Sequence, residues 1–289
     1  MLIFFSSPPF YTQYVHLPPV DAPTPPIIED NPKYYPFFKD ALGAIDGTHI
    51  NCSATAEMRQ VARDRKGGVT QNCLAICGFD MVFYYIFSGW DGSAADSTMF
   101  YDARVTDLKI PAGKYYLADA GFPICDALLI PKRGVRYHLA EWGRAQQRCR
   151  FFNSSVILVL ISSYRPANAD ELFNLRHASA RNVIERIFGV LKRRFRILIY
   201  PAEICMVYQA RIPAALAAVH NFIRMHDPEE IEGFADADDM EQGFFQAAGD
   251  LAEGETRAPE KRRANTRREM IAVAMWEQYQ ALLQERGVM

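Results

Sequence analysis

Three carboxylates lie in surroundings where their charge needs a compensating partner. Asp46 lies in the apolar run 41–52, Asp119 near the end of the run 114–123, and Glu185 in a basic, amphipathic stretch. Burying a lone carboxylate is costly, and a divalent cation is one partner that offsets the cost. Three carboxylates on adjacent elements could hold two Mg²⁺ or Mn²⁺ ions roughly 4 Å apart. Such a site supports attack of an oxygen on phosphorus and departure of another oxygen.

Each of these residues also has a structural interpretation. Asp46 precedes Gly-Thr and Asp119 precedes Ala-Gly, so either could cap a turn. Glu185 stands among basic residues and could form a surface ion pair. Spacing alone therefore supports the triad weakly.

The elements that would position these carboxylates alternate between β-like and helical patterns. Strands are predicted where apolar and β-forming residues run between turn formers, and helices where apolar residues recur at four-residue steps. In chain order these are strands at 41–52, 71–78, 81–89, 114–123 and 126–131, a short helix at 93–105 capped by Ser93, and helices at 168–199 (most firmly 178–195) and 205–225.

Four segments in a fixed order carry a family resemblance. They are GAIDGTHI (43–50), SGWDGSAADS (88–97), YLADAGFP (116–123) and RNVIERIFGVLKRRF (181–195). The series resembles the DDE endonuclease domain of PIF/Harbinger transposases and their domesticated relatives, over about residues 34–226. The resemblance implies an α/β, RNase H-like fold in which helices flank a mixed central sheet.

The resemblance also implies where the catalytic residues lie. Asp46 would be on the central first strand, Asp119 on the adjacent fourth strand, and Glu185 on a helix packed across both. Asp46 would bridge two Mg²⁺ (or Mn²⁺) ions, and the other two carboxylates would each complete one. Asp96 aligns with the family's His-Asp-Ser motif, but Ala95 replaces the histidine here. Whether Asp96 supports the metal ligands therefore stays open, and the same holds for His49.

The activity that the resemblance implies is cut-and-paste DNA transposition. Water would attack phosphorus to cut, and the freed 3′-hydroxyl would attack target DNA, with no covalent protein intermediate. The resemblance implies that the protein binds transposon ends and target DNA. It also implies that the protein forms a homo-oligomer and is located in the nucleus. Family members usually carry a helix-turn-helix before the catalytic domain, and none fits within the first 36 residues. The chain is then either truncated or dependent on a partner, and the resemblance implies a separate Myb-like DNA-binding protein as that partner.

Basic residues near Glu185 are predicted to contact the DNA backbone. The segment 181–196 holds six basic residues and one acidic residue, and the predicted contacts are Lys192, Arg193, Arg194 and Arg196. The alternative is a solvated basic helix face. Weaker candidates are Lys132, Arg133 and Arg136, while His138 and Trp142 are assigned structural roles.

Composition divides the chain into four predicted parts. Nine of the 17 prolines fall within residues 1–36, which predicts an extended arm. The nuclease domain is predicted at 37–226, with an atypical apolar insertion at 149–164. Residues 227–259 are predicted to form an acidic linker, since 227–256 hold eleven acidic residues and no Lys or Arg. A basic, amphipathic helix is predicted at 260–289.

Other classes of protein are disfavoured or left as alternatives. Six irregularly spaced cysteines do not resemble a disulfide framework, which favours an intracellular compartment. A zinc site from His49, Cys52, Cys73 and Cys77 is disfavoured because no Cys-x-x-Cys pair is present. No apolar run of membrane-spanning length occurs. The alternatives to a transposase are a transposase-derived binding module without catalysis and an RNase H-like nuclease acting on RNA or hybrids.

Overall fold

A five-stranded mixed sheet forms the centre of the molecule, in the order β3-β2-β1-β4-β5. The computed structural model describes residues 1–53, 68–136, 165–228 and 256–287. The strands are β1 (Ala41–Asn51), β2 (Thr70–Cys77), β3 (Phe83–Asp91), β4 (Tyr115–Leu117) and β5 (Leu128–Leu129). The first three form an antiparallel meander, whereas β4 runs parallel to β1 and β5 parallel to β4. The predicted hairpin and the mixed sheet are thereby confirmed.

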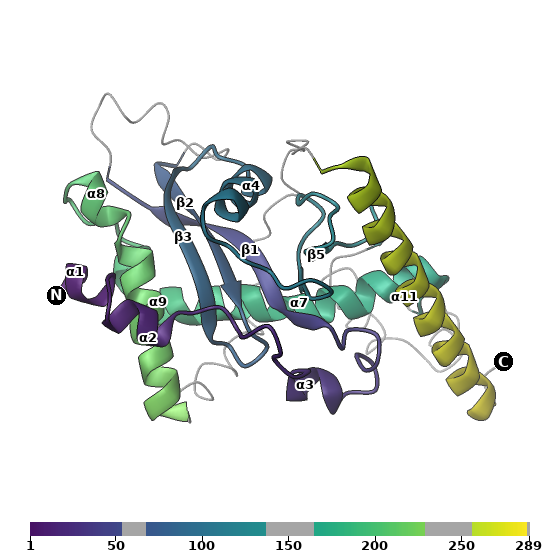
Figure 1. Ribbon diagram of the computed structural model, residues 1–289. Helices are drawn as coiled ribbons and strands as arrows, with labels where there is room; N and C mark the ends of the chain where they lie inside the picture. Colours follow the sequence, from purple (N-terminus) through teal and green to yellow (C-terminus); the bar gives the residue numbers. More distant parts are fainter. Residues whose placement is uncertain (54–67, 137–164, 229–255, 288–289) are drawn as a thin grey trace, which may run out of the picture.

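Helices cover both faces of the sheet, as the burial of β2 shows. All eight residues of β2 are buried, and its side chains alternate between two cores because successive strand residues point to opposite faces. Cys73, Ala75 and Cys77 pack with the long helix α7 (Ala169–Arg194) and with α9 (Ile212–His226). Leu74 and Ile76 pack with α4 (Asp96–Thr106) on the other face. Figure 1 shows α7 running across one side of the sheet.

The helices follow the prediction except at three boundaries, one of which is the end of the helix predicted at 168–199, since α7 ends at Arg194. Helix α4 begins at Asp96, and Ala95 occupies the N-cap without a side-chain hydrogen bond, so the predicted cap at Ser93 was wrong. The segment predicted as one helix at 205–225 is divided into α8 (Met206–Gln209) and α9. Pro213 lies in the first turn of α9, where proline can begin a helix but cannot continue one. Between α7 and α8 lies the 3₁₀ turn η1 (Arg196–Leu198).

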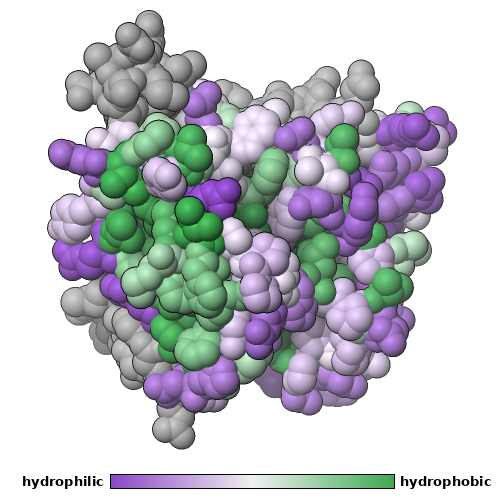
Figure 2. All heavy atoms as spheres, turned by 60° about the vertical axis from the view of Figure 1, so that its left-hand side comes forward, coloured by the Kyte–Doolittle hydropathy of each residue, from purple (hydrophilic) through white to green (hydrophobic). Residues whose placement is uncertain are grey.

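The sequence predicted an extended arm at residues 1–36, and this prediction was wrong in part. The arm contains the short helices α1 (Leu2–Phe5), α2 (Phe10–Tyr14) and α3 (Pro26–Glu29). Aromatic packing explains α2, because the rings of Phe10 and Tyr14 lie 6.1 and 5.3 Å from that of Phe222 on α9. Figure 2 shows hydrophobic side chains gathered on the face that α1, α2 and α9 form.

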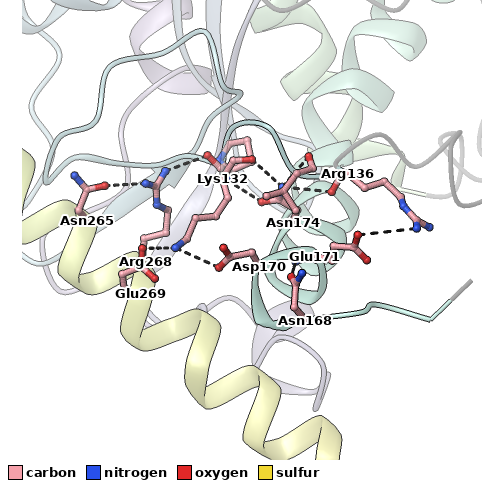
Figure 3. Close-up of polar contacts among 11 residues, drawn as sticks. Lys132, Arg136, Asn168, Asp170, Glu171, Asn174, Asn265, Arg268 and Glu269 are labelled. Carbon is pink, nitrogen blue, oxygen red and sulfur yellow. Dashed lines mark hydrogen bonds and ion pairs between the residues drawn. The ribbon is translucent and has the colours of Figure 1, made fainter. Parts of the chain in front are cut away.

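The C-terminal helix α11 spans Ala258–Glu285, where the sequence predicted a helix at 260–289, and it packs against α7 and β5. Three of its basic residues, Arg263, Arg267 and Arg268, bind neighbouring segments of the protein. Arg267 donates to the carbonyl oxygens of Asp126 and Leu128, at 2.8 and 2.9 Å. Figure 3 shows the neighbouring network, in which Lys132 pairs with Asp170 of α7 and with Glu269 of α11.

Several predictions fall outside the described residues. These are most of the acidic linker, the apolar insertion at 149–164, and the structural roles of His138 and Trp142. Among the residues that the structure describes, no helix has the length and apolarity needed to cross a membrane.

Candidate active site

The register of the central strands brings two of the predicted carboxylates level with each other. Asp46 lies in β1 opposite Ala75 of β2. On its other side, Ala44 pairs with Leu117 at the end of the parallel strand β4. Asp119 follows Leu117 by two residues, as Asp46 follows Ala44, so both carboxylates lie on the same face of the sheet, the face that α7 covers.

Backbone amides orient these two carboxylates. Asp46 is buried, and its Oδ1 accepts a hydrogen bond from the amide of Gly47 at 3.0 Å. Asp119 was predicted on the fourth strand, but β4 ends at Leu117 and Asp119 lies just beyond it; its Oδ1 accepts a hydrogen bond from the amide of Gly121 at 2.8 Å. The strand and the turn therefore hold both carboxylates in place.

The third predicted carboxylate comes from α7, which crosses β1. Glu185 is linked to Asp46 by Arg181, which lies one helical turn earlier on the same helix. The guanidinium of Arg181 donates to Asp46 Oδ2 at 2.8 Å and to Glu185 Oε1 at 3.0 Å. The sequence interpretation left an ion pair of Glu185 with a basic neighbour as its alternative, and the structure contains that pair at four-residue spacing. The bond from Arg181 to Asp46 was not predicted.

Asp96 is a fourth carboxylate in this region. A Cβ added to Gly47 would come within 2.0 Å of Asp96 Oδ1, so the first turn of α4 approaches β1 closely at this glycine. The side-chain amide of Asn72 donates to Asp96 Oδ1 at 2.9 Å and fixes its orientation. His49 lies three residues beyond Asp46 in β1, and its Nδ1 is 3.2 Å from Thr70 Oγ1 on β2.

Electrostatics joins these groups into one site. Burial raises the pKa of Asp46 to about 8, Arg181 opposes that rise, and the negative charges of Asp119, Asp96 and Glu185 add to it. Among the described residues, Arg181 therefore offsets only part of the effect that burial and the neighbouring carboxylates have on Asp46.

The donor set suits a hard divalent cation, because all the candidate ligands are carboxylate oxygens. Within the described ranges, however, no group of three or more His, Cys, Asp or Glu side chains is close enough together to hold a metal ion. The residues of the disfavoured zinc site are likewise not grouped for metal binding, and Cys52, Cys73 and Cys77 are buried free thiols.

The four predicted DNA contacts differ in their surroundings. Lys192 is directed inwards, and its ammonium donates to Thr48 Oγ1 at 2.8 Å and to the carbonyl oxygen of His49 at 3.0 Å. Arg194 lies 2.9 Å from Nδ1 of the buried His220. Arg193 is partly buried, whereas Arg196 is exposed.

Two of the weaker candidates make local contacts, and one of them lies near the site. Arg133 donates to the carbonyl oxygen of Ala120 at 2.7 Å, so its guanidinium is beside the turn that holds Asp119. Arg136 is 4.0 Å from Glu171 of α7.

A mixed sheet with carboxylates on its central strand, beside the neighbouring strand and on a crossing helix defines an RNase H-like nuclease fold of the DDE type. Comparison with known families agrees. The model of the family described as DDE superfamily endonuclease matches residues 45–221, and the chain belongs to this family. The matched segment contains Asp46, Asp119 and Glu185, and the resemblance to the DDE endonuclease domain is confirmed.

The chain is also similar to a curated plant protein. It is 25% identical over 177 residues to "Protein ALP1-like" of Arabidopsis thaliana, a match that covers 55% of this chain and 36% of the relative. The matched part is thus little more than a third of the relative's length. No solved structure matches the chain.

Proposed function

We propose that this chain is a divalent-metal-dependent DNA endonuclease and strand transferase of the cut-and-paste type, with Asp46, Asp119 and Glu185 as the metal ligands. One observation carries the proposal: Arg181 joins the buried Asp46 of β1 to Glu185 of the crossing helix, at 2.8 and 3.0 Å, in a chain of the DDE endonuclease family. A buried carboxylate with other carboxylates nearby is costly unless a cation joins it.

The chain's own residues would bind and orient the reacting groups. Two Mg²⁺ or Mn²⁺ ions, when bound, would activate the attacking oxygen and stabilise the departing one. Asp46 would hold its ligand oxygens at a fixed place, because β1 is paired on both sides. Glu185 would add an oxygen from the crossing helix, and Asp119 one from the turn after β4.

DNA would be held by basic residues at the rim of this site. Arg196 is exposed next to Tyr200, whose hydroxyl accepts a hydrogen bond from it at 3.0 Å. Arg133 lies beside the Asp119 turn. We include both, with the partly buried Arg193, as contacts to DNA phosphates. Lys192 and Arg194 would support the helix from inside, since both donate to groups of the protein.

The cellular setting belongs to the same proposal. A DNA substrate favours a nuclear location, and the family resemblance favours a homo-oligomer acting with a separate Myb-like DNA-binding protein. Immunolocalisation of the tagged full chain and light scattering of the purified protein test the location and the oligomer.

The activity is tested by nicking of supercoiled plasmid with Mg²⁺ or Mn²⁺. Asp46→Asn, Asp119→Asn and Glu185→Gln keep the side-chain shapes and remove one charge each. We expect each to lower the nicking rate by at least about 100-fold, a typical cost of losing a charge-stabilising group. Glu203→Gln removes a carboxylate from an exposed position and is the matched control.

Two outcomes would contradict the proposal. Nicking that survives in all three variants would place the active site elsewhere. A folded wild-type protein that binds duplex DNA but cuts with neither metal would favour the alternative of a transposase-derived binding module.

A further inference from the structure

Arg181 occupies the centre of the candidate site, where it joins two elements. Its side chain is buried, and its two terminal nitrogens donate to different carboxylates. One carboxylate, Asp46, belongs to β1, and the other, Glu185, belongs to the same helix as Arg181. A planar guanidinium is suited to this bridging geometry because its donors are fixed in a fork.

The two halves of the bridge differ in strength. In the Arg181–Asp46 pair the side chains are 8% and 11% exposed, so water competes little for either charge. In the Arg181–Glu185 pair the Glu185 side chain is 50% exposed, and the pair is an i,i+4 contact along one helix. Solvent screening weakens pairs of the second kind, whereas separating a buried pair leaves an uncompensated charge.

The two carboxylates also differ in freedom to move. Asp46 is short, buried and part of a strand with neighbours on both sides. Glu185 has one more methylene and half of its side chain in solvent, so it can change rotamer without disturbing the core.

We propose that Arg181 is a positioning residue that serves as a placeholder cation: it stays bound to Asp46 and releases Glu185 when a divalent metal ion binds. The inference rests on the proposed metal site and adds that Arg181 regulates metal binding there. Without metal, Arg181 partly compensates the carboxylates and keeps Glu185 beside the site. With metal, the ion and the guanidinium compete for the Glu185 oxygen, and Arg181 weakens metal binding.

The test measures Mn²⁺ binding to the full chain by isothermal titration calorimetry, together with thermal unfolding in EDTA and in Mn²⁺. Arg181→Gln removes the competing charge, and Arg181→Lys keeps a charge without the bridging fork. Arg211→Gln removes the same charge from an exposed residue that donates to Ser7, and it serves as the control.

We expect Arg181→Gln to bind Mn²⁺ on the order of tenfold more tightly than wild type, because a competitor for Glu185 is removed. Its unfolding temperature should fall in EDTA and recover further in Mn²⁺ than that of wild type. Arg181→Lys should fold like wild type, and its affinity for Mn²⁺ should lie between those of wild type and Arg181→Gln. In a Glu185→Gln background most of the gain from Arg181→Gln should disappear, because the two residues act on each other.

The possible failures are distinguishable. If wild type binds Mn²⁺ but both Arg181 variants bind it equally or more weakly, the placeholder role is wrong while the metal site stands. The same holds if the gain persists in full without Glu185. If neither wild type nor any variant binds Mn²⁺ or Mg²⁺, the proposed metal site itself is wrong, and the placeholder role is wrong with it.

Discussion

The ammonium of Lys192 on α7 donates a hydrogen bond to the hydroxyl of Thr48, 2.8 Å away on β1. Thr48 is two residues from Asp46, so this bond attaches the helix that carries Glu185 to the strand that carries the central carboxylate. Burial lowers the pKa of Lys192 to about 8, as expected for an ammonium removed from water. Its surroundings are therefore those of a structural residue.

DNA affinity should distinguish this buried lysine from the exposed arginine that follows the same helix. Removing one cation that pairs with a DNA phosphate reduces the steepness of log K against log salt by about 0.9. We expect Arg196→Met to reduce the slope by about that amount and Lys192→Met to leave it unchanged. Fluorescence anisotropy with a labelled duplex at several salt concentrations measures both. A shallower slope for Lys192→Met would mean that its ammonium reaches DNA after all.

The pH dependence of stability should report the charge of Asp46. Burial raises its pKa above the ordinary value of 3.8, against the opposing effect of Arg181, so the native state holds a proton on Asp46 more tightly than the unfolded chain does. Its contribution to stability therefore decreases as the pH rises from about 4 to about 8. Asp46→Asn removes this loss of stability. In EDTA, the unfolding temperature of the variant minus that of wild type should therefore be larger at pH 8 than at pH 5.

Calorimetry or circular dichroism in EDTA checks this expectation, with Glu203→Gln as a control for removing an exposed carboxylate. A temperature difference between Asp46→Asn and wild type that is the same at both pH values would mean that Asp46 is ionised throughout.

Gly47 should tolerate no side chain while Asp96 is present. A Cβ at Gly47 would lie 2.0 Å from Asp96 Oδ1, far inside contact distance, so α4 or the carboxylate has to shift. We expect Gly47→Ala to cost about 1–3 kcal/mol of stability, as overpacking typically does. In an Asp96→Ala background the cost should shrink to well under half. Urea unfolding of the four proteins of this cycle measures the coupling, and purely additive costs would contradict the close approach of the two residues.

The C-terminal helix should stabilise the edge of the sheet next to Asp119. Arg267 donates to two carbonyl oxygens of the β5 segment, and its guanidinium lies 4.4 Å from the ring centroid of Tyr115 on β4. We expect Arg267→Ala to cost about 2–4 kcal/mol, since the substitution removes both the charged donors and the cation–π interaction. Arg262→Ala, at an exposed position of the same helix, should cost under about 0.5 kcal/mol. Equal costs for the two variants would contradict a specific role of Arg267 in holding this edge.

The sequence by itself determined the scaffold and the candidate carboxylates. Alternation and apolar runs located the five strands, four-residue periodicity located α7, and the ordered motifs identified the family. These features are local, because strand and helix periods and short motifs are properties of neighbouring residues. Boundaries failed where tertiary packing prevailed, as at the proline-rich arm, whose aromatic residues form short helices against α9.

The tertiary structure alone decided what each basic residue does. Arg181 reaches a carboxylate 135 positions away in the chain, Lys192 a hydroxyl 144 positions away, and Arg267 a carbonyl 141 positions away. In the sequence all three are simply members of basic segments, and only Lys192 was predicted to contact DNA. The role of a cation depends on its burial and on its nearest opposite charge. Both are set by contacts between distant segments, which no local pattern encodes.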